Sequence, residues 1–268
     1  MHQAPAIIIT HMQANAEPKH TMRRWANWVN NFLLPRMLEP KLNALLSALH
    51  LASPALPVGG FAYSQGLEQA IEERWVTDME QTYVWIRDVM LLSLARQELP
   101  WWLRCYDAAQ AAQWEVLIEA NQQLTVLRET AEFRLESLQM GYSMAKLFAQ
   151  WPGAKVLAQL SAHVGSAEIA WSYPAAYAAL AATTGVDKDT ALAAYLWSWV
   201  ENQVLAAIKT VPLGQIEGQQ LLHRLKEHIG QACIAAQSVD PTQAGSAALG
   251  LALVSARHET QYSRLFRS

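Results

Sequence analysis

Residues 187–212 read DKDTALAAYLWSWVENQVLAAIKTVP, and this stretch indicates the class of fold. It opens on Asp187, a residue type preferred at helix N-caps, and closes on Pro212, which cannot continue a helix. Between them apolar residues such as Trp199 and Leu205 recur at helical spacing, and β-branched residues do not alternate. We therefore predict one helix that runs from Asp187 to Pro212.

The neighbouring segments carry the same pattern. Pro174 suits the first turn of a helix that Gly185 would end. Residues 215–236 are expected to form a further amphipathic helix, because their apolar residues fall on one face. Asp240 and the following Pro241 are expected to open the last helix.

The N-terminal half is expected to be helical as well. Thr77 with Glu80 is a capping-box pattern, so a helix should begin there and should end at Pro100. Residues 114–151 keep helical apolar spacing throughout and stop at a Pro-Gly pair. A first helix is indicated by leucines at three- and four-residue spacing, namely Leu42, Leu45, Leu46 and Leu49.

These segments together predict an all-α, single-domain bundle of about eight to ten helices over residues 37–268, with a C-terminal docking tail. Residues 1–36 read differently and are expected to be a flexible N-terminal extension. Residues 7–9 are too short for a signal-peptide core. Residues 169–186 carry no charge, but Pro174, the hydroxyl residues and the many alanines make a buried helix the expected structure, and no membrane span is predicted.

Composition narrows the classes of function. The net charge is −3, so the chain has no electrostatic footprint for nucleic acid. Cys105 and Cys233 are too few for a disulfide framework and are expected to be small core residues in a reducing compartment. Hydrophobic residues make up 52% of the chain and charged residues 16%, which favours surfaces covered by partner proteins.

Catalytic patterns are largely missing, which predicts that the chain is not an enzyme and holds no metal or other cofactor. It contains no phosphate-binding P-loop. His258 and Glu259 begin a pattern resembling a zinc-protease helix, but Tyr262 stands where the second histidine is required. Ser143 and Lys146 match Ser-x-x-Lys, so a hydrolase that uses these two residues is the alternative function, with an exposed helical pair as the simpler explanation.

Residues 57–68, PVGGFAYSQGLE, form the first of two segments that stand out. Paired glycines allow positive φ angles and close approach of the backbone. The segment is interpreted either as a tight loop packed beneath aromatic residues or as a rigid loop that presents side chains to a partner. Its candidate residues are Gly59, Gly60, Tyr63, Ser64, Gly66 and Glu68.

Residues 255–268, SARHETQYSRLFRS, form the second segment that stands out. Three arginines are interspersed there with aromatic and apolar residues. Such residues dominate protein–protein interfaces, so we predict that this tail docks onto a partner and is ordered mainly by it. The alternative is a tail that folds onto its own domain. The candidate residues are Arg257, His258, Glu259, Tyr262, Arg264, Leu265, Phe266 and Arg267.

Three segments in this order resemble the signatures of the UreF family of urease accessory proteins. They are the loop of residues 57–68, the Pro-Leu-Gly-Gln within residues 207–215, and the tail YSRLFRS of residues 262–268. The resemblance covers about Leu42 to Ser268, and the family pattern does not require residues 1–36.

The resemblance implies a cytoplasmic, all-helical, dimeric protein that binds UreD (also called UreH) and, through that complex, the GTPase UreG. Such an assembly delivers nickel to apo-urease, and the UreF-like protein modulates GTP hydrolysis by UreG. Lys209 is then a candidate contact for UreG, although a cation near a helix C-terminus is also favoured by the helix dipole. A membrane-associated helical protein is a third possibility, for which lipid binding without partners would be the test.

Overall fold

The computed structural model describes residues 39–151, 153–163 and 169–268. Regular structure in these ranges is entirely helical, which confirms the all-α class. The flexible extension expected over residues 1–36 lies outside the described residues. Residues 44–268 form one compact unit, and the architecture below is that of this unit.

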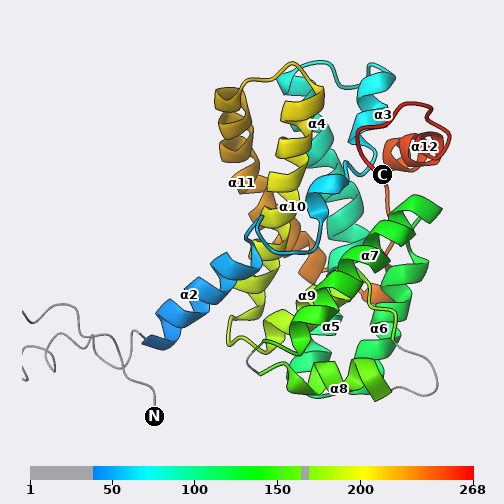
Figure 1. The fold of residues 1–268 in the computed structure, drawn as a ribbon. Coiled ribbons are helices and arrows are strands. Elements are labelled where there is room, and N and C mark those ends of the chain that lie inside the picture. The colour runs from blue at the N-terminus through cyan, green and yellow to red at the C-terminus, as the bar shows by residue number, and fades with distance from the viewer. Residues whose placement is uncertain (1–38, 152, 164–168) are drawn as a thin grey trace, which may run out of the picture. The chain divides into compact units, whose positions relative to one another are not determined.

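Helix α9, Tyr173–Ala182, is surrounded by other helices (Figure 1). Every residue from Pro174 to Ala181 is buried, and helices α5, Leu99–Gln110, and α7, Ala131–Phe148, contact it most extensively. The uncharged stretch is thus a core helix, as the sequence predicted. Among the described residues, no helix combines the length and apolar character that crossing a membrane requires.

A close approach of backbones fixes the entrance to α9. A Cβ added at Gly141 of α7 would lie 2.0 Å from the backbone oxygen of Trp171, so only glycine fits there. Asn121 of helix α6, Trp114–Val126, holds the same segment because its side chain accepts a hydrogen bond from the Ser172 amide at 2.8 Å. The α6, α7 and α9 helices are thereby tied at one point.

Helices α10, Lys188–Thr210, and α11, Gln215–Gln237, form a long helical hairpin (Figure 1). The Asp187 side chain accepts a hydrogen bond from the Thr190 amide at 2.9 Å, so the predicted N-cap is confirmed. Pro212 lies in the turn between the two helices, where no intrahelical amide is needed.

The break predicted at Pro100 is wrong. Helix α4, Met79–Asp88, continues through a π-helical segment, η2, Val89–Glu98, directly into α5. Pro100 lies in the first turn of α5, immediately after the π-helical segment. The wider π turns shift the hydrogen-bond register there, so the missing amide of proline does not interrupt the helix.

Residues 114–151 also differ from the expectation of helical spacing throughout. The chain turns at residues 127–130 between α6 and α7, and Thr130 is the N-cap of α7. Its hydroxyl accepts a hydrogen bond from the Phe133 amide at 3.3 Å. A threonine side chain can satisfy the backbone locally in this way, and apolar spacing alone does not reveal the interruption.

Helix α2, Glu39–Leu51, confirms the first predicted helix, but its leucine stripe is not buried. Leu45, Leu46 and Leu49 are 52%, 52% and 60% exposed. Asp240 and Pro241 open only a 3₁₀ turn. The remaining elements are η1 Gly60–Ala62, α3 Leu67–Glu72, α8 Lys155–His163, η3 Pro241–Gln243 and α12 Leu249–His258.

Candidate interaction site

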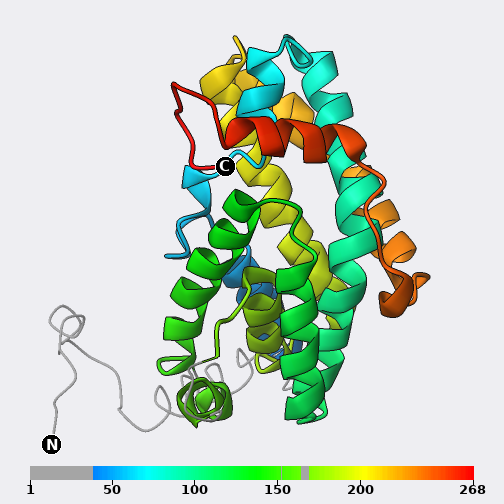
Figure 2. The same ribbon diagram turned by 90° about the vertical axis from the view of Figure 1, so that its right-hand side faces the viewer.

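The loop of residues 57–68 and the tail of residues 259–268 lie side by side, although they are far apart in sequence. Figures 1 and 2 show the tail returning from α12 to the loop that precedes α3. Gly59 has a φ of 78°, which confirms that this glycine pair includes a left-handed residue. Gly60 does not have a positive φ, and an added Cβ would meet only the end of Met140 at 3.4 Å.

Gly66 is the glycine with the stricter requirement. Its φ is 81°, and an added Cβ would lie 2.9 Å from Val254 and 3.3 Å from Leu251, both on α12. A side chain at this position would therefore be strained by the backbone and would collide with α12. This one glycine lets the loop pack onto the helix from which the tail emerges.

Backbone hydrogen bonds join the loop to the end of the tail. The Arg267 amide donates to the Ala62 oxygen at 2.9 Å, and the Ser64 amide donates to the Ser268 oxygen at 2.9 Å. The Ser64 hydroxyl donates to the same Ser268 oxygen at 2.7 Å. The tail thus runs beside the loop and satisfies its polar groups.

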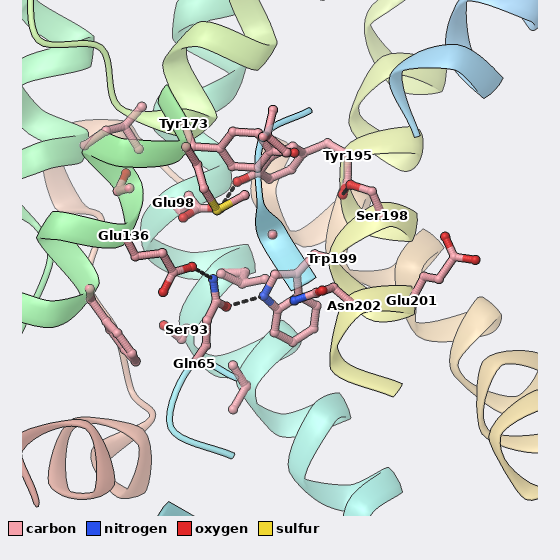
Figure 3. A pocket seen from close by; sticks show the side chains of 18 of the residues that line it. Gln65, Ser93, Glu98, Glu136, Tyr173, Tyr195, Ser198, Trp199, Glu201 and Asn202 are labelled. Atoms are coloured by element: carbon pink, nitrogen blue, oxygen red, sulfur yellow. Dashed lines mark hydrogen bonds between the residues drawn. The ribbon is translucent and has the colours of Figure 1, made fainter. Parts of the chain in front are cut away.

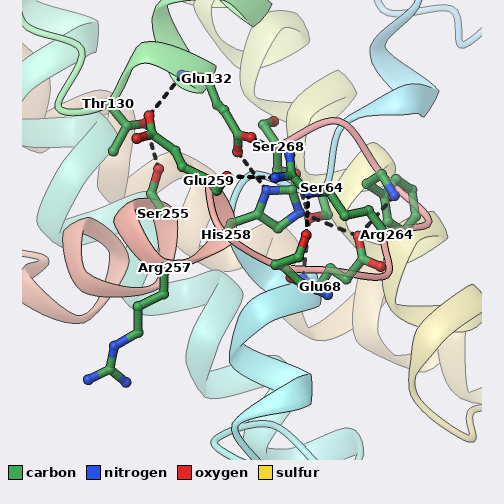
Figure 4. Close-up of polar contacts among 12 residues, drawn as sticks. Ser64, Glu68, Thr130, Glu132, Ser255, Arg257, His258, Glu259, Arg264 and Ser268 are labelled. Atoms are coloured by element: carbon green, nitrogen blue, oxygen red, sulfur yellow. Dashed lines mark hydrogen bonds and ion pairs between the residues drawn. The ribbon is translucent and has the colours of Figure 1, made fainter.

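The Glu68 carboxylate holds the preceding part of the tail (Figure 4). It accepts hydrogen bonds from the amides of Leu265 at 2.6 Å and Phe266 at 2.9 Å. Phe266 is only 5% exposed and packs in a small apolar cluster with Leu67 and Val254. The tail's own domain therefore supplies both polar and apolar contacts to it, which is the alternative left open from the sequence, and docking of the tail onto a partner stays a prediction.

Four charged or ionisable side chains meet beneath the tail (Figure 4). His258 is fully buried, with its Nδ1 2.6 Å from Glu132 and its Nε2 3.5 Å from Glu68. The Arg264 guanidinium contacts Glu132 at 2.5 Å and donates to the backbone oxygens of Gln261 and Glu259. Arg264 therefore shapes the tail through its own backbone and anchors it to α7.

Glu259 and Arg257 add further contacts to α7 and to the end of α3. The Glu259 carboxylate accepts a hydrogen bond from the Ala131 amide at 2.9 Å, at the N-terminus of α7. An acidic group is favoured at such a position by the helix dipole. Arg257 pairs with Glu73 at 2.5 Å, at the end of α3. Both residues therefore have contacts within the chain.

A cavity of about 120 Å³ lies behind the loop and combines apolar walls with polar side chains (Figure 3). Gln65 of the loop bridges two helices there, because it accepts a hydrogen bond from Trp199 and donates one to Glu136, both at 2.5 Å. Glu98 pairs with Arg128 and accepts a hydrogen bond from Tyr195 at 2.7 Å. These polar groups link α7, α10 and η2 behind the loop.

Burial raises the pKa of the Glu136 carboxyl above its usual range, and the hydrogen bonds from Gln65 and Ser268 oppose this only in part. Burial likewise raises the pKa of Tyr63, whose hydroxyl donates to the Gln139 side chain at 2.6 Å. Within the described ranges no group of three or more histidine, cysteine or acidic residues is arranged to hold a metal ion.

Several side chains of the loop, the tail and the adjoining end of α10 remain exposed, and we call them the loop–tail surface. It consists of Phe61, Lys209, Tyr262, Leu265 and Arg267. Phe61 is 69% exposed, Leu265 63% and Tyr262 fully exposed. The Lys209 ammonium lies 5.6 Å from the centre of the Phe266 ring, at the end of α10. Lys209, selected separately from the sequence, is thus joined to the tail by the fold.

Ser143 and Lys146 are not brought together as a catalytic pair. The Ser143 hydroxyl donates to the backbone oxygen of Gln139 at 3.0 Å, within its own helix. The Lys146 ammonium lies over the Tyr142 ring at 4.3 Å. These contacts are those of exposed helical side chains, so no observation favours the hydrolase alternative.

Sequence reasoning missed Gln65, Glu132 and Glu136, which build the inner side of this region. For Glu136 a signal was present in the sequence. It falls on the same helical face as Phe133 and Met140, which are buried, so an acid occupies a core position of α7. For Gln65 and Glu132 no comparable signal existed, because their partners come from distant segments.

The fold and this region define the class of protein. It is an all-helical protein in which hydrogen bonds and ion pairs hold the exposed loop–tail surface in place. The UreF family model matches residues 76–226. The chain is 45% identical over 232 residues to the urease accessory protein UreF of Cupriavidus pinatubonensis, which covers 85% of this chain and 99% of that protein. It is 46% identical over 237 residues to UreF of Cupriavidus necator, with coverage of 85% and 99%.

A third relative, UreF of Delftia acidovorans, is 45% identical over 240 residues and covers 87% of this chain and all of that protein. The chain therefore belongs to the UreF family of urease accessory proteins, as the three sequence signatures indicated.

Proposed function

We propose that this chain is a non-enzymatic adaptor in urease maturation. It binds UreD (UreH) and, through that complex, the GTPase UreG, modulates GTP hydrolysis by UreG, and so helps to deliver nickel to the urease apoprotein in the cytoplasm. It acts without a cofactor of its own. Family membership supports the role in urease maturation, and the loop–tail surface supports the role as an adaptor.

The observation that carries this proposal is the combination of a tail backbone ordered by contacts with its own domain and exposed anchor side chains. Polar contacts to Glu68 and Arg264 hold the tail, while Tyr262 and Leu265 point their apolar surface to solvent. A surface ordered in advance loses less conformational entropy when a partner binds. Aromatic and arginine side chains are also the commonest energetic anchors of protein interfaces.

The test is a capture assay with purified UreD and UreG. Tyr262→Ala with Leu265→Asp changes two exposed side chains, so the helical domain should melt as the wild type does. Capture of UreD should fall at least about tenfold, and urease activation should fall with it, because each central anchor contributes roughly 1–2 kcal/mol. Val126→Asp is the matched control, since Val126 is 70% exposed on α6. Equal capture by the double variant and the wild type would contradict the proposal.

Variants of Lys209 test separately whether this residue contacts UreG. Lys209→Ala should leave UreD capture unchanged and should weaken recruitment of UreG to the complex, whereas Lys209→Arg should preserve it. If UreG recruitment is normal in Lys209→Ala, the lysine interacts only with the dipole at the end of α10 and with the Phe266 ring.

We also propose that the chain acts as a homodimer, with α2 in the interface. Leu45, Leu46 and Leu49 form an apolar stripe that is more than half exposed to solvent. Leu46→Glu should place a charge in that stripe and shift the chain to a monomer in sedimentation. A dimer of unchanged stability in this variant would show that α2 lies outside the dimer interface.

A further inference from the structure

Glu136 joins the loop and the tail from the inside of the molecule. Its carboxyl accepts a hydrogen bond from Gln65 of the loop on one oxygen and from the Ser268 hydroxyl of the tail on the other, both at 2.5 Å. The residue is 4% exposed and lies on the buried face of α7. Among the described residues, only Glu136 forms side-chain hydrogen bonds with both Gln65 and Ser268.

The donors that stabilise this acid are neutral. Arg128, the cation whose charge acts on this carboxyl, pairs with Glu98 of η2, whose charge acts on the carboxyl in the opposite direction. The other ionisable groups here are Tyr63 of the loop, whose own pKa is raised in part by the charge of Glu136, and Tyr195 of α10, which donates a hydrogen bond to Glu98. A buried acid without a cation of its own is costly unless its hydrogen bonds are complete. Losing the tail would remove one of its two donors.

We infer that Glu136 is the positioning residue of the loop–tail surface, because its buried carboxyl holds Gln65 and Ser268 in one arrangement and so sets the loop and the tail together. The consequence for partner binding rests on the proposed function. The positioning itself is a property of the isolated chain and is measured without any partner.

The arrangement links tail docking to a proton. With the tail in place, burial raises the pKa of Glu136. When the tail leaves, the carboxyl gains water and its pKa falls toward the ordinary glutamate range. The docked form thus binds the proton more tightly, so docking is favoured at low pH and this part of its stability is lost as the pH rises through the raised pKa.

Hydrogen exchange of residues 259–268 in the isolated full chain, measured across pH and corrected for intrinsic rates, tests this inference. Glu136→Ala should speed exchange of the tail about tenfold or more, since it leaves two donors unpaired. Glu136→Gln imitates the protonated acid, so it should keep the tail protected and remove the share of the pH dependence that belongs to Glu136. Glu119→Gln, an equal change of charge at an exposed position on α6, is the control.

Two results would overturn the inference: a tail in Glu136→Ala that is as protected as in the wild type, or an unchanged pH profile in Glu136→Gln. If circular dichroism shows that Glu136→Ala does not fold, Ser268→Ala replaces it. This variant removes only the tail hydroxyl and should speed tail exchange about fivefold; unchanged exchange would contradict the inference.

Capture of UreD by the same variants is measured separately. A loosened tail with normal UreD capture would contradict the proposed function of the surface while leaving the role of Glu136 intact. A tail that stays protected while UreD capture fails would contradict the role of Glu136 and leave the proposed function of the surface intact.

Discussion

The surroundings of α9 and the loop–tail junction are built from different interactions. Around α9 the contacts are mainly apolar, with buried alanines of α9 beside aromatic side chains such as Tyr177 and Trp102, and Gly141 lets two backbone segments touch. At the junction the contacts are mostly hydrogen bonds and ion pairs, and Phe266 is the main buried apolar side chain of the tail. Apolar burial accumulates with area, whereas each polar contact contributes only about 1 kcal/mol net.

The comparison shows that one helical unit can combine a rigid core with a surface of lower local stability. Amide exchange should therefore be slowest in α9 and faster in residues 259–268, because the tail can open without unfolding the bundle. Such a tail is ordered enough to present side chains and is held weakly enough to adjust to a partner.

The largest expected effect is at the core. Gly141→Ala places a Cβ 2.0 Å from the backbone oxygen of Trp171. Both atoms belong to or are attached directly to the backbone, so no side-chain rotation can relieve the clash. The free energy of unfolding should fall by about 3 kcal/mol or more. Denaturant melts measure this, and Gly230→Ala is the control, since an added Cβ meets nothing within 4 Å on α11 and should be neutral or stabilising. A small effect of Gly141→Ala would mean that α7 and α9 are not packed so closely.

Phe266→Ala tests the apolar contact of the junction. Removing the ring from its cluster with Leu67 and Val254 should cost about 2 kcal/mol of unfolding free energy. Tail exchange should accelerate roughly thirtyfold, which is the same free energy expressed as a ratio. If the melt is unchanged and the tail stays protected, polar contacts alone hold the junction.

Glu68→Gln tests the polar contacts. The carboxylate accepts two tail amides and lies 3.5 Å from His258, so replacing it should cost about 1–2 kcal/mol and should loosen the tail. The exposed neighbour Glu72 on α3 supplies the control, Glu72→Gln, with no expected change. Hydrogen exchange of the tail compares the two variants. Equal exchange rates would show that Glu68 does not hold the tail.

The smallest effect is expected at Lys209. Replacing it by alanine removes a cation from the Phe266 ring, which is worth roughly 0.5 kcal/mol at an exposed position. Thermal melts of Lys209→Ala and Lys209→Arg should therefore nearly coincide with that of the wild type. A larger loss in Lys209→Ala would show that the lysine supports the fold of the junction, and its effect on partners would then be indirect.

Much of the fold was predictable from local sequence. Asp187, Pro174 and Gly185 act within a few residues of their own positions, so the ends of α9 and α10 followed from residue type. The break at Pro100 was predicted wrongly because the hydrogen-bond register of a π-helical segment depends on packing as well as on residue type. Apolar spacing likewise predicted α2 without showing that its leucines are exposed.

The candidate site was predictable only as two separate segments. Gly59 and the tail residues stood out by type, but no local pattern indicates that Glu68 accepts amides almost 200 residues later in the chain. The local sequence around His258 resembles only an incomplete metal motif, whereas its contacts with Glu68 and Glu132 depend on the packing of α3, α7 and α12.

The sequence by itself determined the helical class, several helix ends and the identity of the family, because periodicity, caps and short motifs act over a few residues. The tertiary structure alone decided that the tail lies on its own loop, that Gly66 rather than Gly60 is sterically required, and that Glu136 is bonded to both segments. Those outcomes depend on contacts between residues 65, 136 and 268, which only the packed helices bring within hydrogen-bond distance.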